Sequence, residues 1–242
     1  MTKALSVATV LMLCASAATV GAQTPPESRA GVAVTAGTFG FGADVAVRIG
    51  AKANLRAGAG TFSLSHQFDA DGITLDASMK LGGAKAQLDW FPFGGGFHVS
   101  PGLLLHNRTR VEAVALVLPN TSFDLGDETN LRSSPSNPVT GTATVGFKNV
   151  APMATIGWGN IVPRGSRRWS VPFELGVVFS SAPTATLNLT GTACNAVGQN
   201  CRNIATDPTL QTQLKNEQDQ MNDDVSGLKL FPVLSLGFSW KF

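Results

Sequence analysis

The chain has 242 residues, enough for one large or two small domains, and combines 26 glycines, 14 phenylalanines and 4 tryptophans with only 14% charged residues. This composition and the mean hydropathy of +0.13 are typical neither of an ordinary cytosolic enzyme nor of a disordered chain. The formal net charge of +2 is small and dispersed along the sequence, which argues against nucleic acid as a partner.

The N-terminus has the features of a secretory signal peptide. Lys3 precedes an uncharged, mainly apolar run over residues 4–20, and the tripeptide Val-Gly-Ala at 20–22 is a small-x-small cleavage pattern. A membrane anchor is the alternative, but the run is short, contains Ser and Thr, and ends in a cleavable site. Cys14 would leave with the signal, since Leu13 stands where a lipoprotein signal has a small residue. We therefore expect a signal peptide over residues 1–22 and a mature chain over residues 23–242.

After residue 30 the apolar residues recur with a period of two, which indicates strands. A transmembrane helix needs about 20 consecutive apolar residues, and the mature chain has no such run. Strands that carry one apolar and one polar face can span a bilayer only as a closed barrel, because every backbone group must be paired there. We expect eight strands, at residues 30–37, 41–49, 53–65, 73–91, 97–112, 140–158, 167–189 and 228–242.

The connections between these strands differ in length and composition. Short links at 50–52, 92–96 and 163–166 alternate with long polar segments at 113–139 and 190–227. Outer-membrane barrels have an even number of strands, short periplasmic turns and longer outer loops, so this alternation supports the count of eight. The apolar parity changes near Gly60, Gly82-Gly83 and Asn149-Val150, and we interpret these positions as bulges or strand irregularities.

The polar face of the strands would carry a network of charges in the barrel lumen. An eight-stranded barrel is just wide enough for side chains to fill it, so a closed core of ion pairs is the first interpretation. A narrow conduit with some anion preference is the second. The predicted network is Asp44, Arg48, Arg56, Asp76, Lys80, Arg108, Arg110, Glu112, Glu174 and Lys241, and the same alternation of faces, with its parity changes, adds Lys85, Asp89 and Lys148.

His98 and Ser100 have the spacing of a His-x-Ser pair on one strand face. This arrangement is similar to that of outer-membrane lipid A deacylases, in which a base activates a serine. However, the pair follows the turn at 92–96, which the topology places on the periplasmic side, away from lipid A. A histidine satisfied within the lumen is the better interpretation. We predict no catalytic residue, no metal site and no cofactor.

The last long loop has features of its own. Cys194 and Cys201 are close enough to form a disulfide in an oxidising compartment, which would brace the loop rather than the fold. Asp207-Pro208 is a good helix start, and apolar residues near helical spacing follow up to Val225. We expect a short amphipathic helix that caps the barrel rim, plugs its mouth or contacts an external partner.

The C-terminal strand alternates up to the last residue. Its apolar positions are Leu234, Leu236, Phe238, Trp240 and Phe242, separated by small or polar residues. A soluble β-sandwich could show alternation too, but it would rarely place three aromatic residues on one face at a chain end.

With the signal peptide and the aromatic turn at 90–93, this strand resembles the small outer-membrane β-barrel family of Gram-negative bacteria, of the OmpA type without its periplasmic domain. The resemblance implies an all-β, antiparallel up-and-down barrel, with the five apolar residues of the terminal strand as a signal for the barrel-assembly machinery. The absence of Tyr departs from the usual aromatic girdle and leaves that place to Trp and Phe.

The sequence therefore predicts a bacterial outer-membrane barrel with a structural or interaction role and no catalysis. Outer-membrane lipid and the assembly machinery are its expected partners, with a small solute or an extracellular partner at the long loops. The alternatives are a narrow pore for small solutes and a lipid A-modifying enzyme.

Overall fold

A computed structural model describes residues 29–70 and 72–242. The predicted signal peptide at 1–22 lies outside these residues. Eight strands close on themselves through antiparallel pairs, in the cyclic order β1, β2, β3, β4, β5, β10, β12 and β16. The bounds of these strands are β1 Ala30–Gly37, β2 Gly40–Gly50, β3 Ala53–Ala70, β4 Ile73–Trp90, β5 His98–Asn107, β10 Ala151–Trp158, β12 Phe173–Phe179 and β16 Leu230–Lys241. The predicted eight-stranded antiparallel barrel is confirmed.

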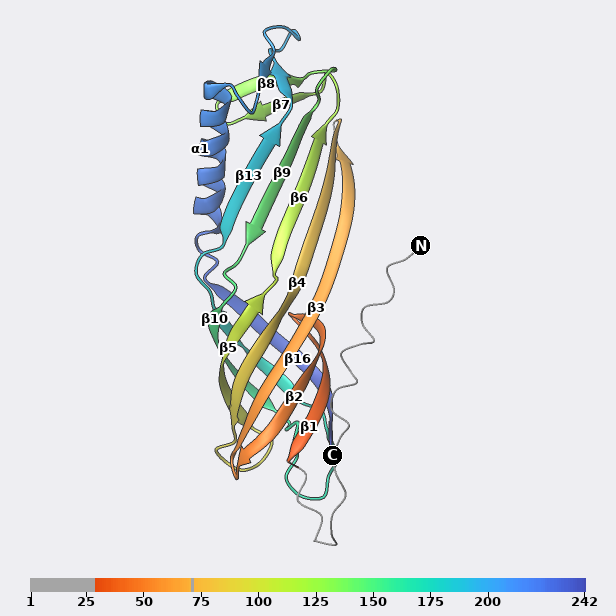
Figure 1. The fold of residues 1–242 in the computed structure, drawn as a ribbon, viewed down its shortest axis with the longest axis vertical. Helices are drawn as coiled ribbons and strands as arrows, with labels where there is room; N and C mark the ends of the chain where they lie inside the picture. Colours follow the sequence, from red (N-terminus) through yellow and green to blue (C-terminus); the bar gives the residue numbers. More distant parts are fainter. Residues whose placement is uncertain (1–28, 71) are drawn as a thin grey trace.

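The barrel closes where the first strand meets the last. The register of β1 and β16 runs from Gly31↔Lys241 to Gly37↔Ser235, so no strand edge of the ring is left open at this seam. The apolar side chains of β16 point away from the lumen and are exposed on the outer surface of the barrel: Leu234, Leu236, Phe238, Trp240 and Phe242. The C-terminus lies at the lower end of the barrel in Figure 1.

A β-sheet extension continues upward from one wall of the barrel (Figure 1). The hairpin of β3 and β4 is 18 residues long on each side and rises beyond the other barrel strands. The lower half of β4 pairs with β5, whereas its upper half pairs with β6 (Arg110–Val117). Beyond β6 the sheet continues through β9 (Val139–Gly146) to β13 (Thr184–Thr190).

A small second sheet and one helix complete the extension. The sheet has the order β15-β14-β8-β7, with β7 Ser122–Leu125, β8 Glu128–Ser133, β14 Thr192–Cys194 and β15 Arg202–Asn203. Helix α1 (Pro208–Val225) begins as the sequence predicts, with the Asp207 side chain accepting a hydrogen bond from the Leu210 amide. Among the described residues, no helix is both long and apolar enough to cross a membrane.

Where β3 and β4 leave the barrel, their apolar side chains change from one face of the sheet to the other. In the barrel, Leu55 and its partner Leu88 are exposed outward while Arg56 and Gln87 are buried in the lumen. Above Gly60 the apolar side chains move to the other face, as in the pair Phe62↔Leu81. The register of β3 and β4 is continuous through this point, so the parity change near Gly60 is not the predicted bulge.

The exchange has a physical reason in the surroundings of each segment. Around the barrel the outward face is apolar, whereas in the extension the apolar residues lie on the opposite face. The upper end of that face packs against a hydrophobic core, while Phe62 and Leu64, lower on the same face, stay exposed. That core contains Val117, Val139, Leu210 and Leu214, and Ile73 packs against it. A register shift does occur between β4 and β5 at Ala84/Lys85, and residues 149–150 lie in the break between β9 and β10.

Three predicted strands are each divided in the structure. Residues 97–112 form β5 and the start of β6, residues 140–158 form β9 and β10, and residues 167–189 form β11 (Trp169–Ser170), β12 and β13. In each case one part belongs to the barrel wall and the other to the extension or the barrel end. The segments at 113–139 and 190–227, expected to be loops, contain the rest of β6, the second sheet and α1.

Candidate functional site

The lumen contains a compact group of buried ionic side chains. Alternation along the strands points Asp44 of β2, Arg56 of β3, Lys85 and Asp89 of β4, and Glu174 of β12 to the inside. Although 130 positions of chain separate Asp44 from Glu174, barrel closure brings these five strand positions together. Because charges are almost never fully buried unless they are paired, their contacts decide what the lumen can do.

Arg56 is the centre of this group, with a side chain that is only 3% exposed. Its guanidinium contacts the Asp89 carboxylate at 2.8 Å and the Asp44 carboxylate at 3.3 Å, and it also donates to Glu174. Three carboxylates from three strands thus share one planar donor, whose five N–H groups suit several acceptors at once. Arg56 therefore links opposite walls of the barrel through its lumen.

The neighbouring polar groups complete the network. Lys85 Nζ lies 3.1 Å from Asp44 and 3.9 Å from Glu174, and His98 Nε2 lies 3.3 Å from Glu174 Oε1. Ser100 Oγ donates to Asp89 Oδ1 at 2.7 Å. Gln87 and Thr155 add a hydrogen bond of 3.0 Å across the lumen. We call the residues Asp44, Arg56, Lys85, Asp89, His98, Ser100 and Glu174 the lumen network.

The hydrogen bonds do not set up His98 and Ser100 as a base and a nucleophile. Ser100 directs its proton to Asp89, and the two ring nitrogens of His98 lie next to the Gly96 carbonyl and Glu174. Activation of a serine requires a base that accepts the serine proton. In this arrangement each of the two side chains contacts a buried carboxylate, Glu174 for His98 and Asp89 for Ser100.

Asp89, His98 and Glu174 also offer ligand atoms within 4.8 Å of one another, a spacing that a metal ion could use. In the structure the Arg56 guanidinium already contacts both carboxylates. A divalent ion would have to displace this permanent cation and leave it buried without its partners, which costs several kcal/mol by order of magnitude. The donor set thus suits the guanidinium better than a metal.

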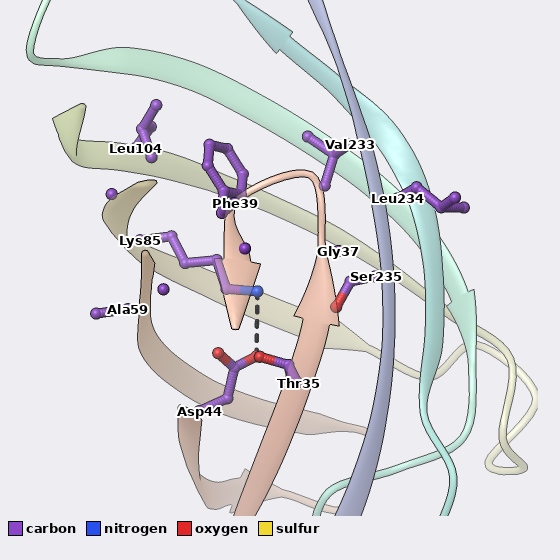
Figure 2. A pocket seen from close by; sticks show the side chains of 13 residues that line it. Thr35, Gly37, Phe39, Asp44, Ala59, Lys85, Leu104, Val233, Leu234 and Ser235 are labelled. Carbon is purple, nitrogen blue, oxygen red and sulfur yellow. Dashed lines mark ion pairs between the residues drawn. The ribbon is translucent and has the colours of Figure 1, made fainter. Parts of the chain in front are cut away.

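An apolar layer lies above the lumen network, toward the extension. It consists of Leu104, Ala151, Met153, Val178 and Val233, with Phe39 and Phe231 packed against it. Figure 2 shows Phe39, Leu104 and Val233 above the ion pair of Lys85 and Asp44. The cavity at this level has a volume of only about 20 Å³, room for a water molecule and little more.

A folded-in connection closes the opposite end of the barrel. The sequence predicts a short turn at 163–166, but the whole segment 159–168 lies between β10 and β11. Ile161 and Val162 are buried against Ala33 and Ala46 inside the barrel wall. Lys241 donates to the carbonyls of Pro163 and Gly165 at 2.8 and 2.7 Å, and Arg48 donates to Pro163 at 3.3 Å. We call residues 159–168 the lower plug.

The other charges predicted for the lumen lie elsewhere. Arg48 and Lys241 donate to carbonyls of the lower plug and are not part of the lumen network. Six residues lie in the extension or at its junction with the barrel, outside the lumen: Asp76, Lys80, Arg108, Arg110, Glu112 and Lys148. They share the polar parity of their strands, but in the extension this parity marks the outer, water-facing side.

Sequence reasoning did not single out several lumen groups. Asn54, Gln87 and Thr155 are buried polar residues on the inward parity of their strands, a signal that the sequence does contain. The apolar residues of the lower plug had no such signal, because Ile161 and Val162 stand between Gly159-Asn160 and Pro163, in a segment with the composition of a turn.

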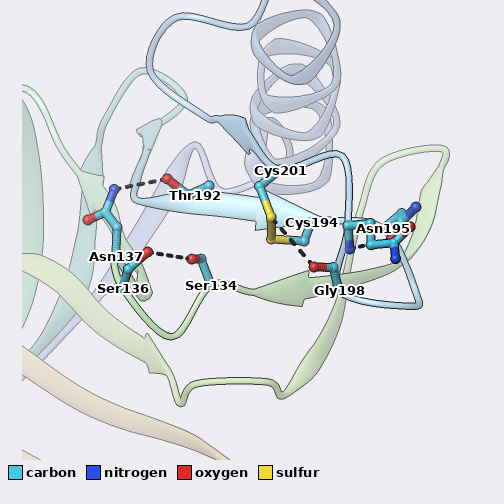
Figure 3. The surroundings of a disulfide bond; sticks show 9 residues. Ser134, Ser136, Asn137, Thr192, Cys194, Asn195, Gly198 and Cys201 are labelled. Carbon is cyan, nitrogen blue, oxygen red and sulfur yellow. Dashed lines mark hydrogen bonds between the residues drawn. A yellow bond between two sulfur atoms is a disulfide. The ribbon is translucent and has the colours of Figure 1, made fainter.

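The structure joins Cys194 and Cys201 by a disulfide, across seven sequence positions (Figure 3). The bridge links the end of β14 to the loop before β15, and the enclosed turn is held by the Asn195 amide donating to the Gln199 carbonyl at 2.8 Å. It lies in the small second sheet, remote from the lumen network. Its role is therefore local to the extension.

Comparisons with known proteins point to the fold. No protein-family model matches the chain, and no curated protein matches it. Among solved structures, CarO2 of Acinetobacter baumannii is 19% identical with a TM-score of 0.54, over 89% of this chain and 99% of that one. CarO of Acinetobacter baumannii is 20% identical with a TM-score of 0.52, over 88% and 97%. At this identity the likeness shows a shared barrel fold.

Proposed function

We propose that the protein is an integral barrel of the bacterial outer membrane with a closed lumen, and that its biological role lies in the extension. The observation that carries this proposal is the filling of the barrel at three successive levels. The apolar layer, the lumen network and the lower plug leave a cavity of only about 20 Å³ near the network. An ion that crossed would have to break buried ion pairs and move the plug.

The outer surface of the barrel supports a membrane location. Its exposed side chains include many Val, Leu, Ile and Phe, which would be unusual in contact with water over such an area. All four tryptophans are exposed and lie toward the lower end of the barrel wall: Trp90, Trp158, Trp169 and Trp240. Tryptophan prefers the interface between lipid and water, so this ring supports an arrangement in which one edge of the bilayer lies at the lower end of the barrel.

Conductance in a planar bilayer tests the closed lumen. The mature protein is refolded in detergent, its folding is checked by the shift in gel mobility on boiling, and a conducting porin refolded in the same way is the positive control. We expect no current steps from the wild-type barrel at the protein density at which the porin gives steps. Discrete steps would overturn the closed lumen and favour the narrow pore.

We further propose that the barrel carries out no reaction on lipid A. The proposal is supported by the hydrogen bond that Ser100 donates to Asp89, a carboxylate that the Arg56 guanidinium already contacts, and not to His98. Mass spectrometry of lipid A from cells that produce the protein or carry an empty vector tests this point. Equal masses are expected, whereas a mass change that Ser100→Ala abolishes would show a lipid A-modifying enzyme.

A further inference from the structure

A group of basic residues lies directly above the apolar surface of the barrel, on the same side of the sheet. Along β4 the outward positions Trp90, Leu88, Ala86 and Ala84 are followed, after Gly82, by Lys80. At about 3.3 Å per residue, Lys80 lies roughly 13 Å beyond Ala84 along the tilted strand. If the apolar surface spans the bilayer, this is the level of the outer lipid headgroups.

The register then places a second cation opposite the first. Lys80 pairs with Arg110 across β4 and β6, on the same face of the sheet. Like charges in this position repel each other and destabilise a sheet unless a counter-charge is near. Within the described part of the chain, both form their ion pair with one carboxylate, Glu112, at 3.7 and 3.9 Å. Two cations and one anion leave a surplus of positive charge.

Arg108 adds a third cation at the break between β5 and β6. Its Nε lies 3.0 Å from His106 Nε2, and its amide donates to the Gly82 carbonyl, which ties this segment to β4. Lys80, Arg108 and Arg110 all line one open hollow of about 670 Å³. We call these three residues the basic cluster.

A second hollow of about 330 Å³ adjoins the first and descends along the apolar surface. Small residues, Ala59, Gly60, Gly83 and Ala84, form its floor, and Phe41 forms one side. Thr61, His106 and Arg108 line both hollows, so the cationic site and the apolar groove are continuous. A groove floored by small residues offers room for a hydrocarbon chain that larger side chains would fill.

We propose that the basic cluster and this groove bind a phosphorylated, acylated glycolipid of the outer leaflet. The phosphate would accept hydrogen bonds from Lys80, Arg108 and Arg110 and so relieve their repulsion, while an acyl chain lies in the groove below. The proposal rests on the membrane placement given under Proposed function. The ligand is a lipid rather than free phosphate, because the apolar groove adjoins the cations and has room for an acyl chain.

Binding of purified bisphosphorylated lipid A to the refolded barrel in detergent tests the cationic half of the site. The variant Lys80→Gln with Arg110→Gln removes the opposed pair, and Arg132→Gln with Lys215→Gln removes the same charge at exposed sites elsewhere in the extension. We expect the first double variant to raise the dissociation constant about tenfold or more, and the control to change it less than about twofold. Equal affinity of wild type and Lys80/Arg110 variant would overturn the proposal.

Filling the groove tests its apolar half. Ala59→Leu places a larger side chain in the groove, and Ala57→Leu, two residues away on the same face of β3, places one outside it. We expect weaker lipid A binding only for Ala59→Leu. If inorganic phosphate competes as well as lipid A, or if both leucine variants bind like wild type, the site does not bind a lipid.

The refolded barrel also allows the lipid site to be tested separately from the membrane placement on which it rests. Flotation with phosphatidylcholine vesicles, which contain no lipid A, reports whether the protein inserts into a bilayer. A barrel that inserts but does not bind lipid A contradicts the lipid site alone. A barrel that fails to insert contradicts the membrane placement.

Discussion

At the scale of single residues, Arg56 has the largest structural role in the lumen. Its guanidinium is buried among Asp44, Asp89 and Glu174, and Lys85 is the other cation that contacts this group. Removing one partner from such a group is far more harmful than replacing the whole group, because the remaining charges stay buried without compensation.

We predict that Arg56→Met lowers the free energy of unfolding by about 3–5 kcal/mol. The methionine retains much of the side-chain volume, but it leaves Asp44 and Glu174 with Lys85 as their cation and Asp89 with the hydrogen bond from Ser100. Guanidinium unfolding in detergent, followed by intrinsic tryptophan fluorescence, measures the change. Arg132→Met, at an exposed position of β8, is the control and is expected to change stability little. A loss of less than about 1 kcal/mol for Arg56→Met would contradict a central role for this residue.

Arg164 of the lower plug differs from Arg56 because its guanidinium has no carboxylate partner among the described residues. Its guanidinium carbon lies 4.5 Å from the centre of the Phe91 ring, and its three nitrogens are buried without a hydrogen-bond partner among the described residues. Burial, and then the neighbouring charge of Arg48, lower the pKa of Arg164 below its ordinary value. The charge is therefore destabilised in the folded state.

We predict that Arg164→Met raises the free energy of unfolding by about 1 kcal/mol, because the thioether retains the packing on Phe91 without a desolvated charge. Arg164→Lys keeps the charge and should bring no gain. Parallel unfolding curves of the two variants and the wild type give the comparison. A stability of Arg164→Met below that of Arg164→Lys would show that the guanidinium contributes a favourable interaction.

At the scale of elements, α1 protects an edge of the extension. β13 is the last strand of its sheet, and an open edge invites pairing with other chains. Side chains of α1 occupy the free backbone groups of β13. Asn222 accepts from the Ala185 amide at 2.9 Å and donates to its carbonyl at 3.0 Å, and Gln218 accepts from the Leu187 amide at 2.9 Å. The helix thus takes the place of a further strand.

We predict that Gln218→Ala with Asn222→Ala increases hydrogen exchange at the amides of Ala185 and Leu187, because they lose their acceptors. Asn216→Ala with Gln220→Ala changes the same residue types at exposed positions of the same helix and should leave exchange unaltered. Exchange followed by mass spectrometry of peptides covering 184–190 distinguishes the two. Unchanged protection in the first double variant would mean that helix packing alone shields the edge.

At the scale of the whole molecule, the proposed membrane placement gives the middle of β2 and the upper part of β3 different surroundings. Val45 at the middle of β2 and Leu64 in the upper part of β3 both expose 55% of their surface. Val45 lies on the outward face of the barrel, where lipid would cover it, whereas Leu64 lies in the extension above. Val45 and Leu64 are therefore equally exposed in the isolated chain, but in a membrane Val45 would contact lipid and Leu64 would contact water.

We predict that Val45→Arg lowers stability in lipid vesicles by about 2–4 kcal/mol, since the residue lies near the bilayer midplane, and that Leu64→Arg has a much smaller effect. Urea unfolding of the barrel from vesicles measures both variants. Equal losses would contradict the division of the molecule into a membrane barrel and a water-exposed extension.

Much of the barrel could be predicted from the sequence, because strand alternation is a local property. The outward stripe of β16 and the inward positions of Asp44, Arg56 and Glu174 follow directly from a period of two. Lys80 could not be placed in this way. A membrane strand with a polar lumen and a half-buried strand of a water-exposed sheet show the same alternation, so parity identifies a face but not its surroundings.

The sequence by itself determined the fold class, the number of barrel strands, the start of α1 and the inward parity of the central charges, since each depends on neighbouring residues. Only the tertiary structure decided which charges meet. Arg56 and Glu174 are 118 positions apart, and barrel closure brings them into contact. It also decided that the lower plug enters the barrel and that Lys80 and Arg110 face each other outside it. These arrangements depend on strand pairing and height, and neither is encoded in a local pattern.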